Sequence, residues 1–303
     1  MSCLLLASSQ GVSSSVQLVK GLSWSFFKKT CSEVESIIKE HLKKVFQDDI
    51  SQLQGSYVSI STTALFSKQD APPNPNLRRT TLKIINDLRN LMEKKCGRRV
   101  VSFADIATIA ARDSIFLSGG PKYEVPLGRR DKLAFASVNE TTENLPSPTQ
   151  NASQILAALT KKSFDTIDVV ALSRAHSIGL GHCGAFTKRL YPTPNSTMDK
   201  NFTCDLKGVC PATNSTNTII LDIRSPNRFD NKYFVNLVNR QSLFTSDQDL
   251  YEDPTTWDIV TSFAKDLELF FQKFVLTMTK MGQLAVLTMT KGEIRAHYSV
   301  RNS

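Results

Sequence analysis

The chain has 303 residues, of which 41% are hydrophobic, and carries a formal net charge of +9 at pH 7. A chain of this length and composition buries a substantial core as one large domain or two small ones, which excludes global disorder. The positive charge is spread over short basic pairs without an arginine-rich arm, which argues against nucleic-acid binding and favours attraction to acidic polysaccharide. No apolar run approaches the length of a membrane span.

The N-terminal residues 1–21 have only part of the pattern of a signal peptide, because the apolar run Cys3–Ala7 is short and no basic segment precedes it. The chain also contains five N-x-S/T sequons, mostly within loops rich in Ser, Thr, Asn and Pro. These candidate glycosylation sites are Asn139, Asn151, Asn195, Asn201 and Asn214. We therefore expect passage through the secretory route and an extracellular or cell-wall location.

Helical periodicity dominates the rest of the chain. Ser32 and Glu35 form a candidate capping box ahead of apolar residues that recur at helical spacing as far as Phe46. Further helices are predicted near 77–95, 102–117, 152–160, 165–178, 230–240, 255–266 and 267–281. The segment 51–67 alternates β-branched residues with serines, which predicts a loop or strand. The predicted fold class is all-α with minimal β structure.

The helix over 165–178 contains the first candidate for site chemistry, His176. Asp165 is a plausible N-cap with Asp168 three positions on, and Gly179 is a plausible stop signal. A lone histidine on an apolar helical face is more often a core residue than a ligand. Whether His176 is a ligand or a core residue therefore depends on the motifs that accompany it.

Those motifs are ALSRAH around His176, LDIRSPNRFDNKYF from Leu221, LFTSDQDL from Leu243, and AARDSIFLSGGP, VPLGRRD and GEIRA elsewhere. Together they resemble the plant secretory (class III) haem peroxidases, in which ALSRAH usually reads ALSGAH or ALSGGH. The resemblance runs from about Leu22 to Ser303 with one large gap. It implies a haem peroxidase fold in which a distal-side half, 22–145, and a proximal half, 146–303, enclose the haem. It also implies hydrogen-peroxide-dependent oxidation of phenolic donors, with roles in peroxide removal, oxidative stress and cell-wall or lignin chemistry.

The resemblance assigns roles to individual residues. His176 is the axial ligand of the iron of haem b, and Asp247 orients its ring. Pro146 borders the position of small phenolic donors. One calcium site, on the proximal side, uses Ser177, Asp222, Ser225, the carbonyl of Arg228 and Asp230.

The resemblance also implies two disulfide bonds. They join Cys31 to Cys96 and Cys183 to Cys210. Where the family has a third pair, this chain has Phe103 and Tyr298, which recover part of the lost stability if they pack together. Cys204 has no evident partner; it either competes for Cys183 or remains a free thiol, and the free thiol is the simpler interpretation.

The distal half of the site is missing from the sequence. The family has a helix with a string like RLHFHDCF and a calcium-binding loop at the position of Ser51–Ser67, and neither is present. The remaining histidines, His41, His182 and His297, fit solvated or structural roles better than that of a substitute base. We therefore expect a peroxidase with strongly impaired turnover, acting as a monomer. The alternatives are an inactive haem- or wall-binding secreted protein and a splice or gene-model variant.

Overall fold

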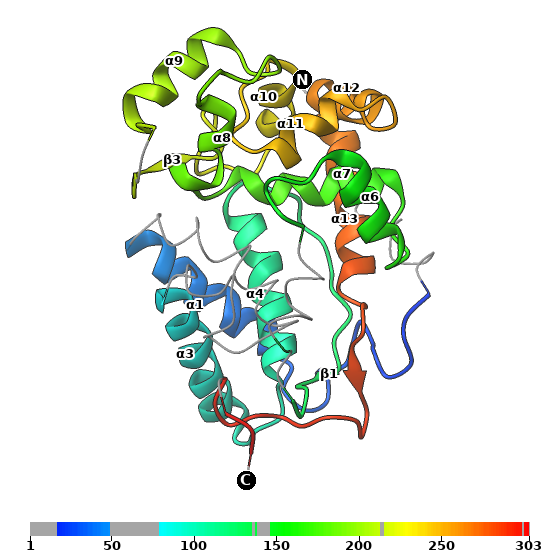
Figure 1. Cartoon of the computed structure of the whole chain (residues 1–303). Coiled ribbons are helices and arrows are strands. Elements are labelled where there is room, and N and C mark those ends of the chain that lie inside the picture. The colour runs from blue at the N-terminus through cyan, green and yellow to red at the C-terminus, as the bar shows by residue number, and fades with distance from the viewer. Residues whose placement is uncertain are drawn as a thin grey trace, which may run out of the picture.

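Helices form most of this computed structural model, which describes residues 17–48, 79–134, 137, 146–212, 215–298 and 300–302. The helices are α1 (Val34–Asp48), α3 (Arg79–Cys96), α4 (Phe103–Leu117), α6 (Ala152–Thr160), α7 (Thr166–Ser173), α8 (Thr187–Leu190), α9 (Lys200–Val209), α10 (Lys232–Val238), α11 (Thr245–Glu252), α12 (Trp257–Lys265) and α13 (Leu267–Met281). Helices α1, α3 and α4 lie at one end of the molecule and α8 to α12 at the other (Figure 1). The predicted helical fold is confirmed, whereas the division into halves at residue 145 stays a prediction.

The β structure in the described residues consists of short antiparallel pairs. β1 (Arg129–Arg130) pairs with β4 (Leu287–Thr288), with Arg129 opposite Thr288. β2 (Leu180–His182) pairs with β3 (Thr218–Ile220), with Gly181 opposite Ile219. The loop or strand predicted for 51–67 lies outside the described residues.

Most predicted helix bounds agree with the structure to within two residues, but two local predictions are wrong. Helix α1 begins at Val34, beyond the predicted cap at Ser32, and the Glu35 carboxylate instead accepts a hydrogen bond from Arg112 at 2.6 Å. The helix predicted over 165–178 is α-helical only to Ser173 and continues as the 3₁₀ turn η4 (Arg174–Ser177), which contains His176. A tighter last turn is common where helices end.

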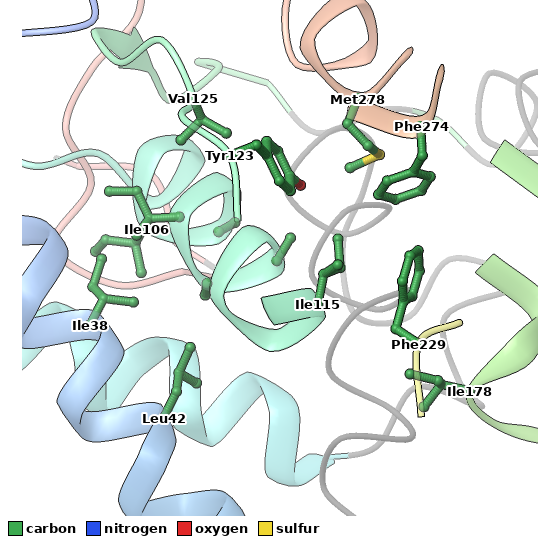
Figure 2. Packing of buried hydrophobic residues seen from close by; sticks show 14 of the residues in the cluster. Ile38, Leu42, Ile106, Ile115, Tyr123, Val125, Ile178, Phe229, Phe274 and Met278 are labelled. Atoms are coloured by element: carbon green, nitrogen blue, oxygen red, sulfur yellow. The ribbon is translucent and has the colours of Figure 1, made fainter. Parts of the chain in front are cut away.

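The main hydrophobic core joins the two ends of the molecule. It contains buried residues of α1, α3, α4, α7, α10, α12 and α13. Figure 2 shows Ile38 of α1 near Ile106 of α4, with Phe229 and Phe274 beyond Ile115 at the far end of α4. The ring centroids of Phe229 and Phe274 are 4.8 Å apart. Because α7 contributes to this core, its position is set by packing along its whole buried face.

The predicted cysteine pairs are confirmed. A disulfide joins Cys31 to Cys96 at the C-terminal end of α3, and another joins Cys183 to Cys210. The thiol of Cys204 is free and exposed, as expected. The residues at the third family position also meet: the rings of Phe103 and Tyr298 pack edge to face, with centroids 5.8 Å apart.

A smaller core surrounds the second disulfide and includes helix α9, which was not predicted from the sequence. Asp199 caps this helix by accepting a hydrogen bond from the backbone N–H of Phe202 at 2.8 Å. Phe202 and Leu206, one turn apart, face the core. The signals of a cap and of i, i+4 apolar spacing were therefore present, but they lie in a segment rich in residues with low helix propensity.

Candidate active site

The predicted pair of His176 and Asp247 lies together, although 71 residues separate them in the chain. Nδ1 of His176 is 2.7 Å from Oδ1 of Asp247. The Asp247 side chain is 4% exposed, whereas that of His176 is 38% exposed. One edge of the ring is thus held against a buried carboxylate, while part of the ring remains accessible.

Tyr233 completes this arrangement and was not predicted. Its hydroxyl donates a hydrogen bond to the same Oδ1 atom of Asp247 at 2.9 Å, and the tyrosine is almost fully buried. Burial and the nearby negative charge of Asp247 raise the pKa of Tyr233 well above its ordinary value, so the hydroxyl stays protonated and acts as a donor. Two donors therefore fix the orientation of one carboxylate.

The charge of Asp247 also changes the histidine. Burial lowers the pKa of His176, but Coulombic attraction and the hydrogen bond from Asp247 outweigh that effect, and the pKa is raised overall. In a neutral ring that donates Nδ1–H to a carboxylate, the lone pair lies on Nε2. The carboxylate makes that nitrogen a stronger electron donor.

The N-terminus of α7 fixes the helix that leads to His176. Asp165 and Asp168 form a complete capping box, with each side chain accepting a hydrogen bond from the other residue's backbone N–H. Asp168 also accepts hydrogen bonds from Thr277 and Lys280 of α13, both at 2.6 Å. The predicted cap at Asp165 is confirmed, and it extends into a contact between two helices.

Arg189 fixes the chain just before Asp247. Its buried guanidinium donates hydrogen bonds to the carbonyl oxygens of Ser242, Leu243 and Phe244, at 2.7, 2.9 and 3.0 Å. The Phe244 ring then packs edge to face on the His176 ring, with centroids 5.4 Å apart. A buried arginine that bonds backbone carbonyls leaves no sequence pattern, which explains why this residue was missed.

The residues predicted to bind calcium also come together. Ser225 donates hydrogen bonds from Oγ to Oδ2 of Asp222 at 3.2 Å and to Oδ1 of Asp230 at 2.9 Å. The carbonyl of Arg228 and the carboxylate of Asp230 both contact the side chain of Arg174. The side chain of Ser177 lies outside the described part of the chain.

The other predicted positions are at the surface. Pro146 is exposed, and so are the sequon residues Asn151, Asn195 and Asn201, while Asn139 and Asn214 lie outside the described residues. Asn151 also caps α6 through a capping box with Gln154. Glycan occupancy at these positions stays a prediction.

A helical fold that presents a histidine backed by a buried aspartate has the proximal arrangement of a haem peroxidase. Comparison with known proteins agrees, because the family model described as Peroxidase matches residues 23–266. The chain is 51% identical to Peroxidase 12 of Arabidopsis thaliana, covering 94% of this chain and 84% of that protein. It is 43% identical to Cationic peroxidase SPC4 of Sorghum bicolor, covering 94% and 83%.

The chain therefore belongs to the peroxidase family, among the secretory class III peroxidases of plants. Members of this family are oxidoreductases that use hydrogen peroxide and small donor substrates, and they hold haem and calcium. In the part of the chain that the structure describes, no helix is both long and apolar enough to cross a membrane.

Proposed function

We propose that this chain binds haem b with Nε2 of His176 as the axial ligand. The observation that carries the proposal is the 2.7 Å contact between His176 Nδ1 and Asp247 Oδ1. It occupies the nitrogen that would otherwise compete for the metal, and it leaves a strongly donating Nε2 on a ring that is 38% exposed. His176 therefore fits the role of an axial ligand that binds the iron of a porphyrin from one side of the ring plane.

Bound haem would supply the redox centre at which hydrogen peroxide is reduced and a phenolic donor is oxidised. The residues of the chain hold and tune the ligand. The Asp247 carboxylate increases electron donation from His176 and keeps its ring in one tautomer. Tyr233 keeps the carboxylate in place through its 2.9 Å hydrogen bond.

We also propose that turnover is strongly impaired. Cleavage of hydrogen peroxide needs a base that takes a proton from one oxygen and delivers it to the other, and a cation that stabilises the developing charge. The sequence between Asp49 and Lys68 contains neither a histidine nor an arginine. A positioned base alone contributes about 10²- to 10⁴-fold to rate, so loss of both groups leaves haem binding without efficient catalysis.

The location and partners follow from the family and the charge. We propose that the protein is extracellular or in the cell wall, because it belongs to the secretory class III peroxidases. Its net charge of +9 favours weak, salt-dependent binding to acidic polysaccharide. We further propose a monomer in which phenolic donors approach near Pro146, whose surface position allows such an approach.

Haem titration of the purified protein tests the proposed ligand. We expect the wild type to bind one haem per chain with a Soret band, and H176A to lose at least about 10-fold in affinity and to change its spectrum. H182A is the matched control, because His182 is nearby in the sequence but exposed in β2. Equal affinity and an identical spectrum for H176A and the wild type would reject His176 as the ligand.

A further inference from the structure

Arg174 departs from the usual family sequence, which has glycine two residues before the proximal histidine. In this chain the arginine is the first residue of the 3₁₀ turn η4 that contains His176, and it is fully buried, with 0% exposure. A buried guanidinium requires negative charge or carbonyl oxygens around it to compensate for lost hydration. The Arg174 guanidinium must therefore have such groups around it.

The compensating groups belong to the set predicted to bind calcium. Nη2 of Arg174 lies 3.1 Å from the carbonyl oxygen of Arg228 and 3.3 Å from Oδ1 of Asp230. It is also 3.8 Å from Oδ2 of Asp222. Nε donates a further hydrogen bond to the backbone carbonyl of Asp230. One guanidinium therefore faces three of the predicted ligand groups.

Ser225, the remaining described member of the predicted ligand set, also belongs to this cluster. The Ser225 hydroxyl donates its proton to the carboxylates of Asp222 and Asp230. Arg174 is the fully buried cation beside this oxygen cluster, and its guanidinium also lies over the Phe229 ring, with 5.0 Å between Cζ and the ring centroid. The side chain is thus held on several sides in one position.

Calcium and Arg174 would compete for these oxygen atoms. Calcium requires six to eight oxygen ligands at about 2.3–2.6 Å. An ion bound to Asp222, Asp230 and the Arg228 carbonyl would draw on the atoms that now face Nη2, and it would place a double positive charge next to a buried single one. The residues present therefore do not fit a calcium ion while Arg174 keeps this position.

We propose that the guanidinium of Arg174 takes the place of the proximal calcium ion, so that the segment leading to His176 is held by a cation built into the chain. Arg174 is then a positioning residue, acting through the oxygen cluster and the turn that contains His176. The inference does not depend on haem binding, because the contacts lie within the protein.

Calcium binding to the full-length protein, measured by equilibrium dialysis together with thermal unfolding in EGTA or excess calcium, tests the proposal. We expect no bound calcium and no calcium-dependent shift for the wild type. R174G, which restores the usual family residue, should bind about one calcium per chain and gain thermal stability when calcium is added. K188A is the matched control: it removes an exposed positive charge on α8 but keeps Arg174 and the oxygen cluster, so it should resemble the wild type.

Two kinds of result would overturn the proposal. Calcium bound to the wild type and lost in D222N would overturn the proposal without relying on the folding of R174G. If R174G binds no calcium, or if calcium does not raise its thermal stability, the proposal is also overturned. Arg174 is then an ordinary buried partner of the carboxylates. Haem content measured on the same samples reports separately on His176.

Discussion

Replacing Asp168 with asparagine tests how the helix before the proximal histidine is anchored. In the wild type, Oδ2 of Asp168 accepts hydrogen bonds from the Asp165 backbone N–H at 3.1 Å and from Lys280 Nζ at 2.6 Å. In D168N an amide nitrogen, itself a donor, would stand at the position of Oδ2 and face both of these donors. The amide oxygen could still accept the hydrogen bond from Thr277.

The expected cost follows from these contacts. Loss of one net hydrogen bond, together with an unsatisfied donor in a buried position, costs about 2 to 4 kcal/mol of unfolding free energy. The Lys280 contact adds little, because that side chain is 44% exposed and water screens the pair. Urea unfolding followed by far-ultraviolet circular dichroism measures the difference between D168N and the wild type.

The pH dependence gives a sharper test. Burial raises the pKa of Asp168, but its hydrogen bonds from Lys280, Thr277 and Asp165 and the charge of Lys280 lower it overall, below its ordinary value of 3.8. A depressed pKa contributes stability that is present above the unfolded-state pKa and is lost as the pH falls through the folded-state pKa. The gap between wild type and D168N should therefore be constant from about pH 7 to pH 5 and shrink towards pH 3.

The control is D258N, which changes an exposed aspartate in the first turn of α12. We expect it to alter the unfolding free energy by less than about 0.5 kcal/mol. A difference for D168N as small as that of D258N, or one that does not shrink in acid, would refute the anchoring of α7 through Asp168.

Three further predictions concern other contacts. A double-mutant cycle with F103A and Y298A should give a coupling energy of about 0.5–1.5 kcal/mol, and additive effects would show that the rings do not replace a cross-link energetically. D247N should weaken haem binding about 10- to 100-fold in a Soret titration, and unchanged affinity would contradict a role behind the ligand. Replacing Cys183 and Cys210 together by serine should cost about 2–5 kcal/mol in urea unfolding, and an unchanged midpoint would show that this disulfide is dispensable.

Local signals predicted the anchored parts of this fold. The cap at Asp165 depends on residues three positions apart, and the bounds predicted for α6 and α13 are those of the structure. In contrast, Ser32 and Glu35 form a good capping pattern that tertiary contacts override, since Glu35 pairs with Arg112, 77 residues away. Local propensity thus decides where no distant partner competes.

The site could be predicted only as far as family motifs reach. His176 and Asp247 were identified by resemblance, and their contact agrees with the roles assigned to them. Tyr233 and Arg174 were not assigned roles, because a hydrogen bond to Asp247 and a position among distant carboxylates depend on how separate segments meet. Arg174 was visible in the sequence as a departure from the motif, but its position among the carboxylates could be found only from the structure.

The central claim is that the proximal ligand survives without the distal groups that cleave peroxide. Steady-state oxidation of a phenol by hydrogen peroxide, measured on the haem-loaded protein beside an intact class III peroxidase, tests it most directly. We predict a kcat/KM for peroxide at least about 10²-fold lower than that of the intact enzyme, despite a normal Soret band. A kcat/KM comparable to the intact enzyme would contradict the claim and would require a base and a cation from elsewhere in the chain.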